Sequence, residues 1–450
     1  MLRLAVPLAL TELGWLAMSF TDTVMVGRLP DSATAIGAVS LGSTLFYTIG
    51  VFGSGIMLGM DTLVAQAYGA RRLEECHRTL WNSIYLACAI TPLLMASVLA
   101  FFPLFPKFGL QPALVASTIP FLKALIWSTL PLALYFTLRR YLQAMHIVKP
   151  VAFALISANL VNLLGNWVLV YGHLGAHKYG VAGSGWSTCI SRTYMVVVLA
   201  IAAVYYDRKR QSGLWSASRR LELNRIRELM RLGLPAAIQL LLEIGAFAFA
   251  TFLIGKLGAV QLAGHQIALN VASFTYMVPL GIGSAAAIRV GHAMGARDMQ
   301  GAARAGWMAL LFGSLFMSCS GLMLFLFSKP IARIYTPEPD VISVGAVLLL
   351  VAAIFQLFDG LQVVATGALR GAGNTRIPML ANFVGYWVIG LPLGAFLCFK
   401  LKFGAVGMWA GLCLALVFIG SALVGVWHSV IKKLVIASAT TPQLESVSPK

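Results

Sequence analysis

Three carboxylates stand inside long apolar stretches of this sequence. They are Asp22, Glu243 and Asp359, in a chain of 450 residues that contains only 15 Asp and Glu. An acid within a membrane span costs about 2.5–3.5 kcal/mol on insertion scales and by default marks a functional site. Because a carboxylate can bind a proton or a metal cation, we interpret these acids as the ion-binding part of a transport mechanism.

The composition defines the environment of these acids. Hydrophobic residues make up 59% of the chain and charged residues 11%, and the mean hydropathy is +0.85. Soluble globular domains do not have this composition, and a membrane span needs about 20 apolar residues. The sequence predicts twelve spans, at 4–27, 33–59, 79–103, 114–137, 150–172, 181–206, 232–255, 260–286, 306–328, 341–368, 377–399 and 404–430.

The net charge of +18 reflects membrane topology. Lys and Arg concentrate at the termini and in every second gap between spans, above all in residues 207–231. By the positive-inside rule, this distribution predicts that both termini are cytoplasmic. It also removes the reason to expect a nucleic-acid partner.

The sequence repeats itself. The segment from Pro7 reads PLALTELGWLAMSFTDTVMVGRL, and the related segment PAAIQLLLEIGAFAFATFLIGKL begins 228 positions later, at Pro235. Because six spans separate the copies, they enter the membrane from the same side. We therefore predict an all-α membrane protein built from two parallel-repeat six-helix bundles that enclose substrate between them.

The repeat also predicts domain boundaries. We expect an N-terminal bundle at 1–206, a basic cytoplasmic linker at 207–231, a C-terminal bundle at 232–431 and a cytoplasmic tail at 432–450. The linker is expected to form an amphipathic helix on the membrane surface, with its Arg residues toward anionic lipid.

Counting helical rise places the acids at two depths. Glu243 and Asp359 lie about 18 and 17 Å from the cytoplasmic edge, at a rise of about 1.5 Å per residue. Two carboxylates that share a low-dielectric cavity cannot both stay ionised without a counter-charge, so one is protonated or a cation is bound. The pair therefore has the chemistry that an antiporter needs.

Asp22 lies deeper, at roughly 25–29 Å from the same edge, as do Asn166 and Thr188. Asn162 and Asn166 are four residues apart and share a helix face. With Thr188 they can supply hydrogen bonds to Asp22 in either protonation state. A structural alternative is an ion pair between Asp22 and Arg192 or Lys123, the basic residues inside the N-terminal spans.

Four other polar residues have open roles. Glu12, near the entry of the first span, is equally consistent with a function and with a solvated or paired face. The position of Asp61, at the cytoplasmic end of the second span, favours a hydrated structural role for it. His265 and Gln266 are either satisfied core groups, which is favoured, or residues that line a cavity.

Several segments resemble one family. They are TDTVMVGRL around Asp22, VAQAYGAR at 64–71, the stretch 240–270, and FQLFDGLQVVATGALRGAGNTRIPM from Phe355 to Met379. Together they are similar to the multidrug and toxic compound extrusion (MATE) family, especially its NorM-like bacterial branch, over nearly the whole chain to about residue 430.

The resemblance implies an exporter of organic cations, driven by inward Na⁺ or H⁺. Carried over to this chain, it places cation binding, and a possible Na⁺ site, at Glu243 and Asp359. It assigns ion coupling to Asp22 with the asparagines of the fifth span. One departure concerns Phe355, where the NorM-like pattern has a tyrosine whose hydroxyl helps to bind Na⁺. Since Na⁺ prefers oxygen ligands, the coupling ion stays open.

The resulting prediction is a secondary antiporter in a bacterial inner membrane that exports cationic and amphipathic small molecules. We expect it to act as a monomer among membrane lipids, without a cofactor beyond its coupling ion. A P-loop and the common hydrolase motifs are absent from the sequence, which argues against an ATPase or an enzyme. The alternative is a flippase for lipid-linked precursors, whose cavity should carry several cations to bind pyrophosphate.

Overall fold

The computed structural model describes residues 2–108 and 111–440, and these ranges contain helices and no strand. The predicted all-helical fold is therefore confirmed. The α-helices are α1 (Leu2–Val26), α2 (Ser32–Met57), α3 (Gly59–Gly69), α4 (Leu73–Ala100), α5 (Pro112–Leu125), α6 (Thr129–Ala144), α7 (Lys149–Tyr171), α8 (Val181–Arg210), α9 (Leu223–Gly255), α10 (Ala259–Gly295), α11 (Met299–Tyr335), α12 (Pro339–Gly371), α13 (Arg376–Asn382), α14 (Leu391–Ala395) and α15 (Gly404–Thr440). Short 3₁₀ segments are η1 (Phe102–Phe108), η2 (Ile126–Ser128) and η3 (His173–Gly175), and π-helical segments are η4 (Phe383–Gly390) and η5 (Phe396–Lys400).

Eleven of the twelve spans that the sequence predicts are matched by candidate spans in the structure. Within the described residues, eleven helical segments are long and apolar enough to cross a membrane. Helix α1 is not among them, but its 25 residues are long enough for a further span, and it carries Glu12 and Asp22. Some spans join several elements: α2 continues into α3, and α13, η4, α14 and η5 together form the span at 376–400.

The linker differs from its prediction. Residues 207–210 complete α8, residues 211–222 are not helical, and α9 already begins at Leu223. The expected amphipathic surface helix over 207–231 is therefore wrong. Helix α8 ends because Gln211 adopts a left-handed conformation with φ of 48°, and Gly213 follows with φ of 82°. The polar continuations of α8 and α9 extend these helices beyond their apolar spans.

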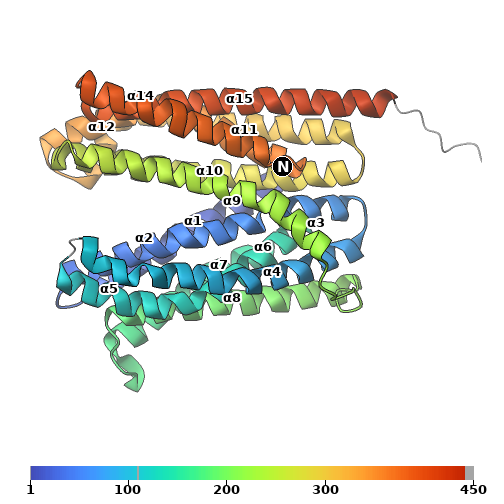
Figure 1. The fold of residues 1–450 in the computed structure, drawn as a ribbon, viewed down its shortest axis with the longest axis horizontal. Coiled ribbons are helices and arrows are strands. Elements are labelled where there is room, and N and C mark those ends of the chain that lie inside the picture. Colours follow the sequence, from blue (N-terminus) through green and yellow to red (C-terminus); the bar gives the residue numbers. More distant parts are fainter. Residues whose placement is uncertain (1, 109–110, 441–450) are drawn as a thin grey trace, which may run out of the picture. The chain divides into compact units, whose positions relative to one another are not determined.

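The chain divides into two compact units. The N-terminal unit contains residues 2–68 and 72–247, and the C-terminal unit contains residues 69–71 and those from 248 onward. In the N-terminal unit, α7 packs between α1 and α8, and α5 packs on α8 (Figure 1). In the C-terminal unit, α12 packs against α10, α11 and α15. The division falls inside α9, and the predicted bundle boundaries stay a prediction.

Two glycines let α7 and α8 approach closely. A Cβ on Gly165 of α7 would lie 2.6 Å from Ser187 Oγ of α8, and a Cβ on Gly183 of α8 would lie 2.5 Å from the carbonyl oxygen of Leu169. Real Cβ atoms do not approach other atoms this closely. Small residues at helix contacts are typical of membrane proteins, where packing drives association. The resulting contact brings the polar residues of α7 and α8 together.

Candidate functional site

Asp22 lies at the meeting point of α1, α7 and α8. Its Oδ1 accepts hydrogen bonds from Asn166 Nδ2 at 2.8 Å and Asn162 Nδ2 at 3.0 Å, and its Oδ2 accepts one from Thr188 Oγ1 at 2.9 Å. All four side chains are buried. The structure thus brings together the four residues that the sequence grouped as the N-terminal site.

Ser187 extends this cluster and was not among the site residues predicted from the sequence. Its hydroxyl donates to the backbone oxygen of Asn162 at 2.7 Å and accepts from Asn162 Nδ2 at 3.5 Å. The signal was available, because GSGWST places several small polar residues at the start of an apolar span. Asn166 Oδ1 is buried and has no hydrogen-bond partner among the described residues. One carbonyl oxygen beside Asp22 is therefore left for water or a cation.

Polar contacts on both sides of Asp22 join α1 to α7. Asn159 Nδ2 donates to the backbone oxygen of Gly14 at 3.2 Å, and Tyr171 Oη donates to that of Met25 at 2.6 Å. A Cβ on Gly14 would lie 2.7 Å from Leu155, so the two helices touch closely at this level too. These contacts hold α1 against α7 on both sides of Asp22.

The alternative role of Asp22, as half of a structural ion pair, is not supported. Arg192 donates from Nη1 to Ser128 Oγ at 2.6 Å, and its guanidinium lies 4.8 Å from the ring centre of Phe46. Lys123 is exposed. Among the described residues, neither base comes within ion-pair distance of Asp22. Asp22 is held by neutral donors, and Arg192 interacts with it electrostatically without an ion-pair contact.

Two other acids of the N-terminal unit are paired. Glu12 Oε1 forms an ion pair with Arg139 Nη2, and Asp61 Oδ2 accepts from Arg140 Nη1 at 3.4 Å. Asp61 is only 1% exposed, so the expected hydrated role for it is wrong. Of the two roles predicted for Glu12, a function or a solvated or paired face, the structure shows the paired one. The consecutive arginines of α6 provide the counter-charges within a buried helix end.

In the C-terminal unit, His265 is a satisfied core residue, as the sequence analysis favoured. Trp409 Nε1 donates to His265 Nδ1 at 2.9 Å, and His265 Nε2 lies 2.7 Å from Thr251 Oγ1. An indole nitrogen can only donate, so Nδ1 is the acceptor and Nε2 carries the hydrogen. The Trp409 ring also stacks on Phe355 with a centroid distance of 5.5 Å. Phe355, 2% exposed, is thereby part of this aromatic core.

The remaining predicted residues fall at separate places in the chain. Glu243 lies on α9 in the N-terminal unit, and Asp359 lies on α12 in the C-terminal unit, each 8% exposed. Gln266 of α10 is exposed, so the favoured role of a satisfied core group is wrong for this residue. On α12, Gln356 precedes Asp359 by three residues and donates from Nε2 to Thr275 Oγ1 at 2.7 Å. A shared site for Glu243 and Asp359 stays a prediction.

Family comparison explains why the two halves of this sequence are alike. The MatE family model matches the chain twice, at residues 7–168 and 235–396. The second match begins 228 positions after the first, which is the offset between Pro7 and Pro235. The chain belongs to the MatE family. The predicted internal duplication is thereby confirmed, and the chain is a multi-pass membrane transporter and not an enzyme.

Relatives of this MatE chain match it almost from end to end. A probable multidrug resistance protein NorM from Mesorhizobium japonicum is 36% identical, over 95% of this chain and 92% of the relative. A protein of the same description from Brucella suis is 34% identical, over 92% of this chain and 89% of the relative. The resemblance to the NorM-like branch is therefore confirmed.

Solved MATE structures share the fold. A MATE in the bent conformation aligns with a TM-score of 0.85 at 17% identity, over 98% of this chain and 96% of that one. The eukaryotic MATE transporter AtDTX14 aligns with a TM-score of 0.83 at 20% identity, over 97% and 98% of the two chains. At this identity, the likeness supports the helical architecture alone.

Proposed function

We propose that this MatE chain is a secondary antiporter that exports organic cations, including cationic drugs and dyes, in exchange for inward H⁺ or Na⁺. The observation that carries the proposal is the Asp22 site, a buried carboxylate on α1 that receives three hydrogen bonds and forms no ion pair with a described base. The description of the relatives as multidrug resistance proteins supports the substrate class.

The hydrogen bonds around Asp22 suit proton exchange. In the ionised state, all three partners donate to the carboxylate. When a proton binds to Oδ2, the Thr188 hydroxyl can rotate and accept it, since a hydroxyl both donates and accepts. The two amides can continue to donate to Oδ1. The site therefore accommodates both protonation states without rearrangement of the asparagines.

The oxygen atoms around Asp22 are few for a hard metal cation. Asn162 Oδ1 accepts from Asn166 Nδ2 at 3.2 Å, so Asn166 Oδ1 is the amide oxygen left without a described partner. Hard cations such as Ca²⁺ take six to eight oxygen ligands, and Na⁺ likewise prefers several oxygens. In the C-terminal unit, Phe355 lacks the hydroxyl that the tyrosine of the NorM-like pattern would provide as a ligand for Na⁺. Both features favour H⁺ over Na⁺.

Transport requires that ion binding favour one arrangement of the transporter over the other. In the proposed cycle, the outward-open form takes up the ion at Asp22 and releases the organic cation, and the inward-open form reverses both steps. Glu243 and Asp359 are proposed as further ion or substrate carboxylates, to be tested singly. We also propose a bacterial inner membrane location, cytoplasmic termini and a monomeric transporter.

The flippase alternative needs unpaired cations for pyrophosphate. The two buried arginines of α6, Arg139 and Arg140, already pair with Glu12 and Asp61. Arg192 is engaged by Ser128 and Phe46. The buried basic groups of the N-terminal unit are thus committed to internal partners, which favours organic cations as the cargo.

The proposal is tested in liposomes. Purified protein is reconstituted, a proton gradient and a Na⁺ gradient are imposed separately, and movement of a cationic dye is followed by fluorescence. We expect the proton gradient to drive dye transport, and Asp22→Asn to abolish it while an exposed Asp31→Asn control does not. Absence of dye movement under either gradient would overturn drug antiport.

A further inference from the structure

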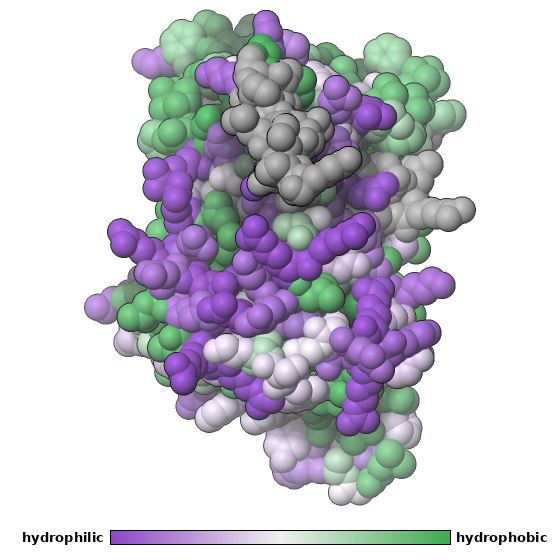
Figure 2. All heavy atoms as spheres, turned by 90° about the vertical axis from the view of Figure 1, so that its right-hand side faces the viewer, coloured by the Kyte–Doolittle hydropathy of each residue, from purple (hydrophilic) through white to green (hydrophobic). Residues whose placement is uncertain are grey.

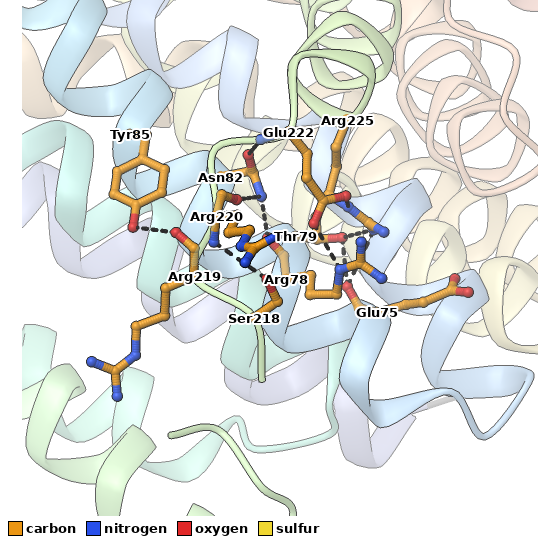
Figure 3. Close-up of polar contacts among 10 residues, drawn as sticks. All are labelled: Glu75, Arg78, Thr79, Asn82, Tyr85, Ser218, Arg219, Arg220, Glu222 and Arg225. Atoms are coloured by element: carbon orange, nitrogen blue, oxygen red, sulfur yellow. Dashed lines mark hydrogen bonds and ion pairs between the residues drawn. The ribbon is translucent and has the colours of Figure 1, made fainter. Parts of the chain in front are cut away.

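The segment between α8 and α9 lies along α4. We call residues 211–222 the strap. Near its start, His77 Nε2 lies 2.8 Å from Ser212 O and Trp81 Nε1 lies 3.4 Å from Leu214 O. Towards its end, Tyr85 Oη contacts Arg219 O at 2.8 Å, Asn82 Oδ1 contacts Glu222 N at 2.8 Å, and Arg78 Nε contacts Glu222 Oε1 at 2.7 Å (Figure 3). Most of these bonds involve backbone atoms of the strap, so its path does not depend on its own exposed side chains.

Two tryptophans face each other across this contact. The ring centroids of Trp81, on α4, and Trp215, on the strap, are 5.8 Å apart, with the planes tilted by 56°. The guanidinium carbon of Arg219 lies 5.1 Å from the Trp81 centroid and 4.9 Å from the Trp215 centroid. We call Trp81 and Trp215 the tryptophan clamp. It holds a flat cation against two indole faces, the rings that attract cations most strongly.

The occupant of the clamp is attached weakly. Arg219 is exposed, and its guanidinium makes one hydrogen bond, from Nη2 to Trp215 O at 3.2 Å. No acid among the described residues lies within ion-pair distance of it, whereas Arg225 contacts Glu222 at 3.3 Å. Figure 3 shows the Arg219 side chain directed away from the polar network of the strap. A cation–π contact at an exposed site is weak, so a cation from solution can compete for the two rings.

The walls of the clamp are held independently of Arg219. Trp81 belongs to α4, and its ring nitrogen is directed to Leu214 O. In the sequence, Trp215 lies between Leu214 and Ala217, which are both buried. The backbone next to Trp215 is anchored, because Leu214 N donates to Asp207 Oδ1 at 2.8 Å. Trp215 itself is 50% exposed. Removal of the arginine side chain therefore leaves two accessible indole faces in place.

We propose that the tryptophan clamp is a capture site for flat organic cations and that Arg219 is the internal occupant which they displace. The strap joins α8 to α9 at the right-hand side of Figure 1, and Figure 2 shows that hydrophilic residues gather on this side of the molecule. This side is cytoplasmic under the predicted topology, the side from which an exporter loads. The inference deepens the proposed function and rests on it for the direction of transport, but binding at the clamp does not need a gradient.

The test measures binding of ethidium, a planar aromatic cation, to the purified full-length protein in detergent by fluorescence anisotropy. Arg219→Gln vacates the clamp, and we expect it to lower the dissociation constant about two- to fivefold, the size of one exposed cation–π contact. Arg220→Gln is the matched control, because it removes the same charge from the neighbouring exposed residue without opening the clamp. It should leave the dissociation constant close to that of the unmodified protein.

A second pair of variants tests whether the Trp215 ring binds the dye. In the Arg219→Gln background, Trp215→Ala should cancel the gain in affinity, whereas Trp215→Phe, which keeps an aromatic face, should retain most of it. Dye bound elsewhere on the chain contributes equally to all variants and cancels in the comparison. The proposal is overturned if Arg219→Gln and Arg220→Gln change affinity equally, or if Trp215→Ala leaves the gain intact.

The two proposals fail separately. If Arg219→Gln tightens ethidium binding but no gradient moves dye in liposomes, the capture site stands and antiport is wrong. If gradients drive transport but the clamp variants bind ethidium like their controls, antiport stands and the capture site is wrong.

Discussion

Thr188 Oγ1 donates a hydrogen bond to Asp22 Oδ2 over 2.9 Å, and unlike the amides of Asn162 and Asn166 it can reverse its role by rotating one bond. Thr188→Val keeps the shape and removes the hydroxyl. A hydrogen bond to a charged group is worth about 1.5–3 kcal/mol, so we expect proton-driven dye transport in liposomes to fall roughly tenfold or more. Thr188→Ser should restore it, and equal rates for Val and Ser would contradict the proton-exchange role.

The buried pair of Glu12 and Arg139 makes a prediction about stability. Glu12→Gln leaves the Arg139 guanidinium, which is 1% exposed, without its counter-charge. Breaking a buried pair in this way costs about 3–5 kcal/mol of the free energy of unfolding. Thermal unfolding in detergent measures the loss, and exposed Glu228→Gln is the control. The double variant Glu12→Gln/Arg139→Met should recover most of the stability, and a single variant as stable as the control would refute the pair.

The contact between α7 and α8 depends on Gly183. A Cβ there would meet the Leu169 carbonyl oxygen at 2.5 Å, and backbone cannot rotate away as a side chain can. We expect Gly183→Ala to lower the free energy of unfolding by about 1–3 kcal/mol and to reduce transport, because Thr188 would shift away from Asp22. Gly425→Ala on α15, where no atom lies within 4 Å of the added Cβ, should be harmless.

Phe355 leads to a prediction about the coupling ion. Its ring stacks on Trp409 and offers no oxygen four residues before Asp359 on α12. We expect a Na⁺ gradient alone, set against choline at constant pH, to drive little dye transport in the unmodified protein. Phe355→Tyr should raise the Na⁺-driven component while leaving the proton-driven component in place. Strong Na⁺-driven transport by the unmodified protein would contradict the assignment of H⁺ as the coupling ion.

The strap should loosen in acid. The hydrogen bond from Arg78 holds the pKa of Glu222 below its ordinary value. Since the folded-state pKa is depressed, this contribution to stability is complete at neutral pH and is lost as pH falls through the lowered pKa. The protection factors of residues 211–222, which correct for the slower intrinsic exchange of amides in acid, should therefore fall at acid pH. Glu222→Gln should show fast exchange already at neutral pH, and a slow strap in that variant would argue against the role of this ion pair.

Hydrophobicity and charge carried most of the fold prediction. Long apolar runs must become helices in a membrane, because every backbone polar group needs an internal partner there. The spans and the duplication at an offset of 228 were therefore readable from the residues, and the family match confirms the duplication. The linker was not readable in this way. Its arginines suggested a surface helix, but hydrogen bonds with α4 hold residues 211–222 in a non-helical path.

The sequence alone determined which residues are costly in a membrane, and so it selected Asp22 and the polar residues of the fifth and sixth spans. Only the tertiary structure decided their partners. Glycines at the α7–α8 contact let Thr188 reach Asp22, while Arg192 turns to Ser128 and Phe46. Helical period gives the face of a side chain and its depth, but a hydrogen bond depends on how closely two helices approach. That distance is set by packing across the whole contact, and no local pattern in the sequence contains it.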